Sequence, residues 1–221
     1  MTDAYIDMIL KRLRRSGCQL APGLTDQEVD QIEARYGFRF PPDLRRFLQK
    51  ALPVSDPWVN WRDESKESIR ERLDRPADGI CIDIEYNNIW KEDWGPRPED
   101  LQEAFLVARQ KIVEAPTLIP IYAHRYIPDE PHAEGNPVFS VIQTDIIYYG
   151  YDLLSYFISE MGRPSFEPSR YARLLPDWAA KSPREIRLWS DFAHWEWHVQ
   201  RGDGNWAFLP ELPADFENDE A

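Results

Sequence analysis

Cysteine is scarce in this chain, and long apolar runs are missing. The 221 residues include only Cys18 and Cys81, without the paired spacing of a disulfide framework or a metal-binding knuckle. No apolar run approaches the roughly 18 residues of a membrane-spanning helix. The charged run at residues 11–15 precedes any stretch long enough for a signal peptide. These absences favour a reduced, cytoplasmic protein that is neither secreted nor inserted in a membrane.

Positive charge is also in deficit, since 26 lysines and arginines face 39 acidic residues, for a formal net charge of −13. Such a field repels phosphate backbones, which disfavours nucleic acid as a partner. It attracts basic proteins, because complementary potentials speed their encounter. The alternative is that the acidity only keeps the protein soluble.

Phosphate-binding glycine loops, Cys-x-x-Cys pairs and basic aromatic strips are missing as well, so the sequence predicts no cofactor. Aromatic residues are abundant instead, with nine Trp, ten Tyr and ten Phe. Each can bury roughly 150–250 Å² of surface, enough to support a sizeable core.

The pattern of apolar residues predicts an α+β domain in which N-terminal helices pack on a mainly antiparallel sheet. The first helix is expected over residues 3–15, and Thr25 with Glu28 forms a capping box that begins the second. The remaining elements are a helix over 43–48, a charged helix over 65–73, a strand over 80–84, a helix from 101 to 112, strands over 117–127, 137–143 and 145–149, and helices over 151–161 and 182–200. We expect one domain over residues 1–210, with a family-like core over about 20–160, a helical extension over 161–210 and an acidic tail over 211–221.

Four tryptophans fall in segments expected to be loops, where a solvent-facing indole suggests a binding role. Together with two neighbouring carboxylates they form the predicted partner-binding set: Trp58, Trp61, Trp90, Glu92, Asp93 and Trp94. The alternative is that the indoles pack beneath their own loops.

A second set, His124, Arg125, Asn136 and Asp145, lies among tyrosines in the strand-rich segment. It is interpreted mainly as a structural polar cluster at the end of the sheet, with an aromatic contact surface as the alternative.

Two catalytic alternatives have weaker support. His194 and His198 are four residues apart on the expected last helix and could share a metal ion, although no third ligand is evident. Ser140, His124 and Asp145 have the residue types of a hydrolytic triad, but Ser140 lies within a strand rather than on a sharp nucleophile turn. No catalytic, cofactor or metal residue is therefore predicted.

Two blocks carry a resemblance to a known family. Residues 37–48, GFRFPPDLRRFL, preceded by LTDQE at 24–28, resemble the N-terminal signature of the SUKH superfamily, also called the Smi/Knr family. HRYIP at 124–128 and GNPVFS at 135–140 look like bacterial members of the same group. The resemblance covers about residues 20–160 and leaves out the Trp-rich C-terminal segment.

The resemblance implies an α+β fold without catalytic residues. For many bacterial members it implies an immunity protein that neutralises a cognate polymorphic toxin, often a nuclease or deaminase. We therefore expect a non-enzymatic protein-binding domain whose partner is a basic toxin domain. A regulatory scaffold with several partners is the alternative, and a metal- or triad-dependent hydrolase is the less favoured one.

Overall fold

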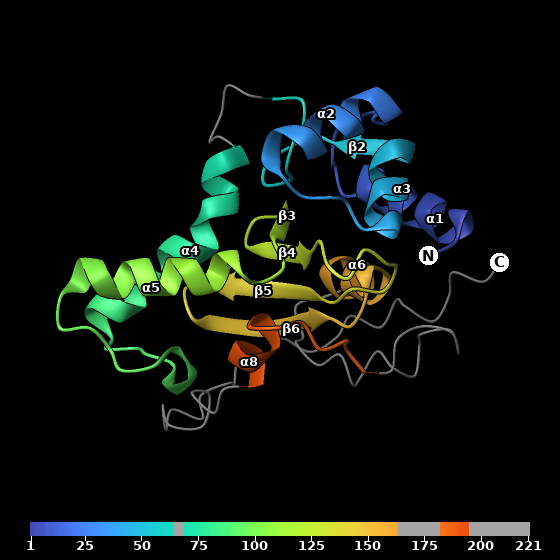
Figure 1. Cartoon of the computed structure of the whole chain (residues 1–221). Helices are drawn as coiled ribbons and strands as arrows, with labels where there is room; N and C mark the ends of the chain where they lie inside the picture. The colour runs from blue at the N-terminus through green and yellow to red at the C-terminus, as the bar shows by residue number, and fades with distance from the viewer. Residues whose placement is uncertain (64–68, 163–181, 195–221) are drawn as a thin grey trace.

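The computed structural model describes residues 1–63, 69–162 and 182–194, and it has the predicted α+β architecture (Figure 1). Helices α1 (Asp3–Arg15), α2 (Asp26–Tyr36) and α3 (Pro42–Lys50) lie where the sequence predicts them. Strands β1 (Leu20–Pro22) and β2 (Ala51–Pro53) pair antiparallel beside these helices.

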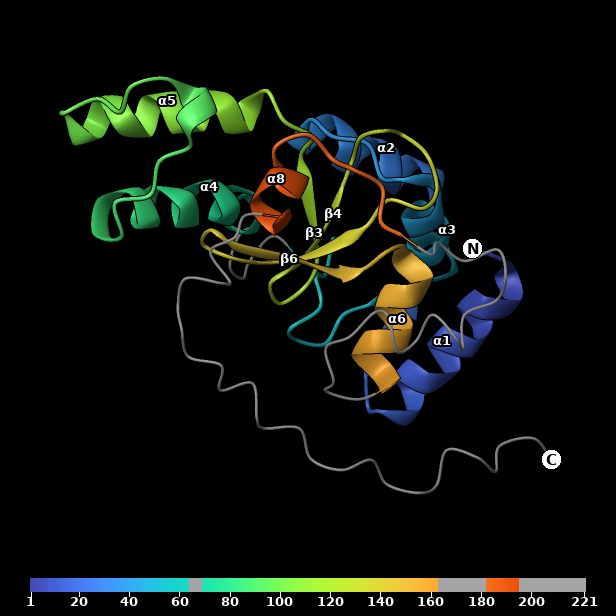
Figure 2. The same ribbon diagram turned by 90° about the horizontal axis from the view of Figure 1, so that it is seen from below.

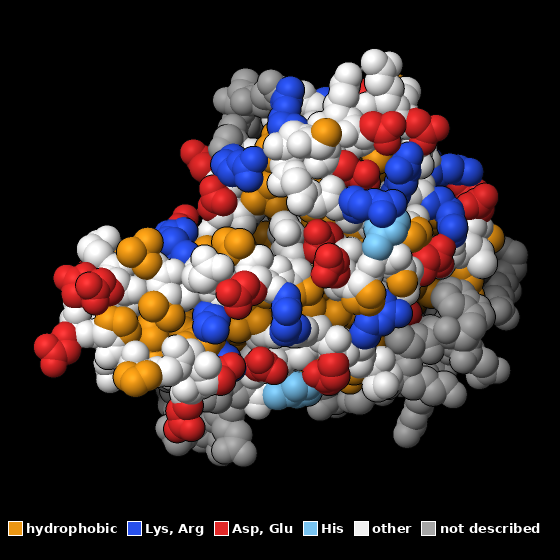
Figure 3. All heavy atoms as spheres, viewed as in Figure 1, with side chains coloured by type: hydrophobic (Ala, Val, Ile, Leu, Met, Phe, Trp, Pro, Cys, Tyr) orange, Lys and Arg blue, Asp and Glu red, His pale blue; other side chains and the backbone are white. Residues whose placement is uncertain are grey.

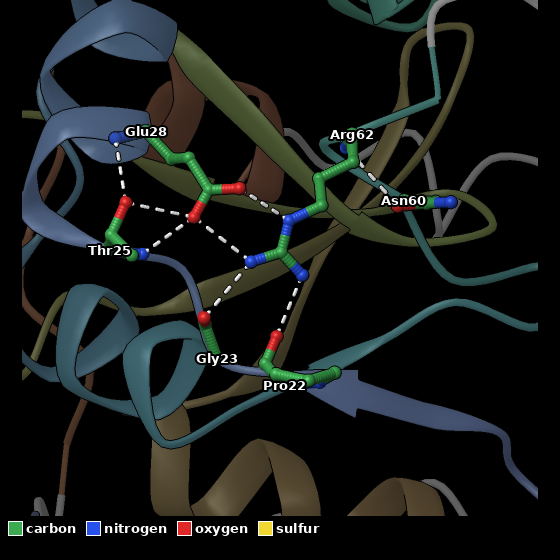
Figure 4. A network of polar contacts seen from close by, with 6 residues as sticks. All are labelled: Pro22, Gly23, Thr25, Glu28, Asn60 and Arg62. Atoms are coloured by element: carbon green, nitrogen blue, oxygen red, sulfur yellow. Dashed lines mark hydrogen bonds and ion pairs between the residues drawn. The ribbon is translucent and has the colours of Figure 1, made fainter.

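The start of α2 is held by a network of polar contacts (Figure 4). The Thr25 hydroxyl accepts from the Glu28 N–H, and the Glu28 carboxylate accepts from the Thr25 N–H, which confirms the predicted capping box. Arg62 also binds this carboxylate at 2.5 and 3.0 Å, and it donates to the carbonyls of Pro22 and Gly23. One guanidinium thus ties the loop after β2 to α2 and to the end of β1.

This network predicts a dependence of stability on pH. Hydrogen bonds from Arg62 and Thr25 lower the pKa of Glu28 from its ordinary value of 4.5 to about 2. A lowered carboxyl pKa stabilises the fold above the unfolded value, and the gain is lost as pH falls through the folded value. The destabilisation caused by Glu28→Gln should therefore be largest near pH 6 and shrink between about pH 4.5 and 2 in urea titrations.

Glu99→Gln is the control, since Glu99 is an exposed glutamate outside this network, whereas Glu28 is half-buried. Its effect on the urea midpoint should be small and nearly independent of pH. An equal loss of stability for Glu28→Gln at both ends of that pH range would contradict the role given to the ionised carboxylate.

The central sheet has the strand order β3–β4–β5–β6, and all neighbours are antiparallel. Its strands are β3 (Leu118–Tyr122), β4 (Arg125–Pro128), β5 (Val138–Ile142) and β6 (Asp145–Gly150). The predicted β5–β6 hairpin is confirmed. The single strand predicted over 117–127 is wrong, because a tight turn at Ala123, with φ of 46°, and His124 folds it into the hairpin β3–β4.

Side chains of the sheet alternate between two hydrophobic clusters, as the period of a strand requires. Ile119, Ile121 and Ile127 join α1, α2, α3 and α6 (Leu153–Gly162) on one face. Tyr126 and Phe139 join α4 (Ile69–Tyr86), α5 (Leu101–Val113) and α8 (Trp189–His194) on the other. Figure 2 shows α8 and the pair α4–α5 on the opposite side of the sheet from α1 and α6.

The strand predicted over 80–84 is wrong, because these residues lie in the helix α4 (Ile69–Tyr86). Ile80 and Ile84 are four residues apart and fully buried, whereas Ile82 between them is 43% exposed, which is helical periodicity. Gly79 lies within the same helix. A Cβ at Gly79 would lie 2.9 Å from the Cα of Gln143, so glycine permits close contact with the β5–β6 turn.

The helix predicted over 182–200 begins later, as α8 (Trp189–His194) within the described residues. Residues 183–186 are not helical, because Arg184 reaches back to the Asn136 side chain and the Glu134 carbonyl. The turn before α8 places Leu188 at φ of 69°. No helix in the described ranges is long and apolar enough to cross a membrane.

Candidate protein-binding surface

Helices α4 and α5 (Leu101–Val113), with the connection over 87–100, form a projecting helical hairpin that we call the arm (Figure 2). Ile80 and Ile84 of α4 pack with Ala104 and Ala108 of α5, and all four are fully buried. The small alanine side chains let the two helices approach closely. The arm therefore has its own apolar seam, and this seam is continuous with the core beneath the sheet.

The base of the arm is fixed to the β5–β6 turn by Asp83, which is 4% exposed. Its carboxylate accepts from the Thr144 N–H at 2.8 Å, from the Thr144 hydroxyl and from Asn87 Nδ2 at 2.6 Å. Buried carboxylates are stable only when hydrogen bonds replace their lost hydration. These contacts position α4 relative to the sheet, a role that the sequence alone does not assign to Asp83.

The connection between the helices contains the short helix η1 (Glu92–Trp94). Trp94 is 8% exposed and packs edge-on against Trp90 at 5.4 Å between ring centroids and against Phe192 of α8 at 6.3 Å. Trp90 is half-buried, and its Nε1 donates to the Gly95 carbonyl at 2.7 Å. The indoles thus stabilise the loop and leave Glu92 and Asp93 exposed on its outside.

Trp58 and Trp61 are core residues, so the expectation that they face solvent is wrong, as it is for Trp94. Trp58 is 9% exposed and packs against Tyr122 and Phe157. Trp61 is 5% exposed and lies edge-on to Phe40 at 5.1 Å. Irregular backbone does not imply exposure, because these loops run against the N-terminal helices and the sheet.

The arm exposes apolar side chains that the partner-binding prediction did not include. Leu106 is 68% exposed and Val113 is 78% exposed, and their separation of seven residues places them on one face of α5. On α4, Ile82 and Tyr86 are 43% and 73% exposed. The exposure of Leu106 and Val113 could have been predicted from the sequence. The predicted inner face of α5 consists of Leu101, Phe105, Ala108 and Ile112, and helical spacing places Leu106 and Val113 outside that face.

Acidic side chains surround these apolar positions. Residues 82–114 contain eight carboxylates and four cationic side chains. The exposed carboxylates of this segment are Glu85, Glu92, Asp93, Glu99, Asp100, Glu103 and Glu114. Figure 3 shows hydrophobic side chains gathered over α5 and acidic ones at the outer end of the arm.

The cations of the arm are largely engaged by the protein itself. Lys91 lies 3.7 Å from both Asp93 and Asp191, and Arg109 pairs with Asp78 at 2.7 Å. Arg97 donates to the Ile84 carbonyl at 2.8 Å and to the Asn88 side chain. The potential over the outer end of the arm is therefore negative.

The predicted polar cluster is divided among separate structural contacts. The Arg125 guanidinium donates to Ser140 Oγ at 2.9 Å, pairs with Glu160 at 3.3 Å and lies 3.7 Å from the centre of the Tyr149 ring. It thereby joins β4, β5, β6 and α6. Because the Ser140 hydroxyl is buried and bound by Arg125, the geometry does not favour it as the nucleophile of a triad with His124.

The other members of this set lie at loops and turns. Asn136 is fully buried, and its Nδ2 donates to the carbonyls of Pro128 and Pro131, both at 2.9 Å. Asp145 is exposed at the start of β6. Burial, together with the nearby cations Arg125 and Arg75, lowers the pKa of His124 in the β3–β4 turn.

Among the described residues, no group of three or more His, Cys, Asp or Glu side chains could hold a metal ion. His194 Nε2 lies 3.1 Å from a Glu185 carboxylate oxygen, and His198 lies outside the described residues.

A cavity of about 450 Å³ lies near the start of α3 and is lined in part by Asp43, Glu134 and Arg184. Its charges are engaged internally, since Glu134 pairs with the Met1 ammonium and Asp43 accepts from the Gly135 N–H.

Comparison of the chain with protein-family models, curated proteins and solved structures gave no match. The resemblance to the SUKH superfamily thus depends on the sequence blocks alone. The arm is the described surface that combines exposed apolar side chains with concentrated charge of one sign.

Proposed function

We propose that the chain is a non-enzymatic, SUKH-like protein-binding domain that acts as an immunity protein against a basic bacterial toxin domain, such as a nuclease or deaminase. The observation that carries the proposal is the acidic arm with its exposed Leu106 and Val113. Exposed apolar residues rimmed by charge are typical of protein interfaces. Complementary charge would speed capture of a toxin whose own surface is basic in order to bind nucleic acid.

Neutralisation of growth arrest tests this function. The full chain is co-expressed with each basic toxin domain encoded beside it, and colony formation is compared with cells that carry the toxin domain alone. We expect one toxin domain to be neutralised and to form a complex with the chain of one-to-one stoichiometry. Failure to rescue growth from any neighbouring toxin, or the absence of toxin-like neighbours, would contradict the proposal.

The contribution of charge can be separated from folding with matched variants. Glu99→Gln with Glu103→Gln removes two charges from the arm, and Asp3→Asn with Asp30→Asn removes two exposed charges elsewhere. The arm pair should slow association with the toxin about tenfold at low salt, and the difference should fade above about 0.5 M salt. Equal association rates for the two pairs would contradict the role given to the arm.

A further inference from the structure

We propose that the outer face of α5 is a docking site for a basic amphipathic helix of the partner. This inference rests on the proposed function, because it names the part of the partner that the arm receives. Leu106 and Val113 are separated by about 10 Å along the helix axis, since each residue rises about 1.5 Å. Two apolar side chains in such a line form a stripe that a second helix can follow with its own apolar residues.

Charges at both ends of the stripe favour a basic occupant. Glu99, Asp100 and Glu103 lie in and before the first turn of α5, and Glu114 follows its last residue, all of them exposed. Two cations lie between Leu106 and Val113. The Arg109 guanidinium is paired with Asp78, and the Lys111 ammonium lies 4.0 Å from a Glu114 carboxylate oxygen, so the three carboxylates before and in the first turn contribute most of the negative charge. An apolar helix flanked by lysines or arginines therefore meets carboxylates beyond both ends of the apolar contact.

A second copy of this chain is a poorer occupant. Each copy has a formal net charge of −13, and the arm concentrates carboxylates at its outer end. Pairing two arms would bring like charges together, which opposes association. The geometry and the charge thus both favour a basic partner.

The stripe is held in place without the partner. Ala104 and Ala108 on the opposite side of α5 are fully buried against α4, and Asp83 fixes α4 to the β5–β6 turn. A helix face that is already ordered loses little conformational entropy on binding. The partner's helix therefore meets a preformed surface.

The test is an NMR titration of the ¹⁵N-labelled full chain with a synthetic helical peptide of about 18 residues that has leucines on one face and lysines on the other. A peptide of the same composition in scrambled order is the control, because it keeps the charge and loses the apolar face. We expect the largest amide shifts in α5 and in residues 91–103. The affinity should exceed that for the scrambled peptide by about tenfold or more.

Variants make the result specific to the stripe. Leu106→Ser with Val113→Ser should weaken peptide binding about tenfold or more, whereas Ile142→Ser, which removes a 52% exposed apolar side chain outside the arm, should not. Shifts centred elsewhere, equal binding of both peptides, or no shifts at millimolar peptide would overturn the docking site. So would concentration-dependent shifts of the α5 amides without peptide, which would indicate self-association.

The two proposals can fail independently. If a toxin is neutralised equally well by the wild type and by the variant Leu106→Ser with Val113→Ser, the immunity function stands and the α5 docking site is wrong. If no toxin is neutralised but the peptide binds α5 as described, the docking site stands and the immunity function is wrong.

Discussion

Replacing Trp189 with alanine should lower the free energy of unfolding by about 3–5 kcal/mol, the usual cost of removing a large buried aromatic side chain. Trp189 is 1% exposed and belongs to the cluster between the sheet, α4 and α5. Its Nε1 donates to the Pro116 carbonyl at 2.7 Å, so the substitution also leaves a buried acceptor without its partner. Urea unfolding followed by circular dichroism measures the change.

Asp191→Ala is the matched control on the same helix, because Asp191 is exposed and its ion pair with Lys91 is long, at 3.7 Å. It should change the free energy of unfolding by no more than about 0.5 kcal/mol. A loss below about 1 kcal/mol for Trp189→Ala would mean that α8 is not part of the cooperative core.

Replacing Asp83 with alanine should cost about 2–4 kcal/mol, because it removes the acceptor of the Thr144 N–H, the Thr144 hydroxyl and the Asn87 amide. Hydrogen exchange should rise most in the β5–β6 turn and at the C-terminal end of α4, where these donors lie. Binding of the basic peptide should also weaken, because the docking site depends on an arm that is already fixed.

Glu85→Ala provides the comparison for Asp83, since Glu85 lies two residues later on α4 and is exposed. It should leave the free energy of unfolding within about 0.5 kcal/mol of the wild type. Similar losses for both substitutions, or unchanged exchange in the β5–β6 turn of the Asp83 variant, would contradict the anchoring role.

The sequence predicted best those elements whose signals are local. The Thr25–Glu28 capping box and Gly37, at φ of 77°, mark both ends of α2 by contacts within a few residues. The β5–β6 hairpin was similarly evident from its short connection. Two assignments failed, the first because tertiary contacts decided it and the second because a local turn was not recognised. Packing against α5 and the sheet makes residues 80–84 helical despite their β-branched side chains, and the turn at Ala123 divides the strand predicted over 117–127.

The candidate site was predicted only in part, because tertiary packing decides which side chains of a loop are exposed. Glu92 and Asp93 are exposed as the binding interpretation requires, but Trp58, Trp61 and Trp94 are buried. Exposure in an irregular segment depends on which element the segment packs against, and the local sequence does not carry that information. Leu106 and Val113 were detectable in principle, because they lie outside the predicted inner face of α5.

The most direct test of the binding account is affinity capture of three tagged full chains from cells that also express the neighbouring basic toxin domains. The chains are the wild type, Leu106→Ser with Val113→Ser, and the control Ile142→Ser. The account predicts that the wild type and the control each retain one equivalent of a single toxin domain, and that the double variant loses it. Equal retention by all three chains, or retention of no toxin domain by the wild type, would contradict it.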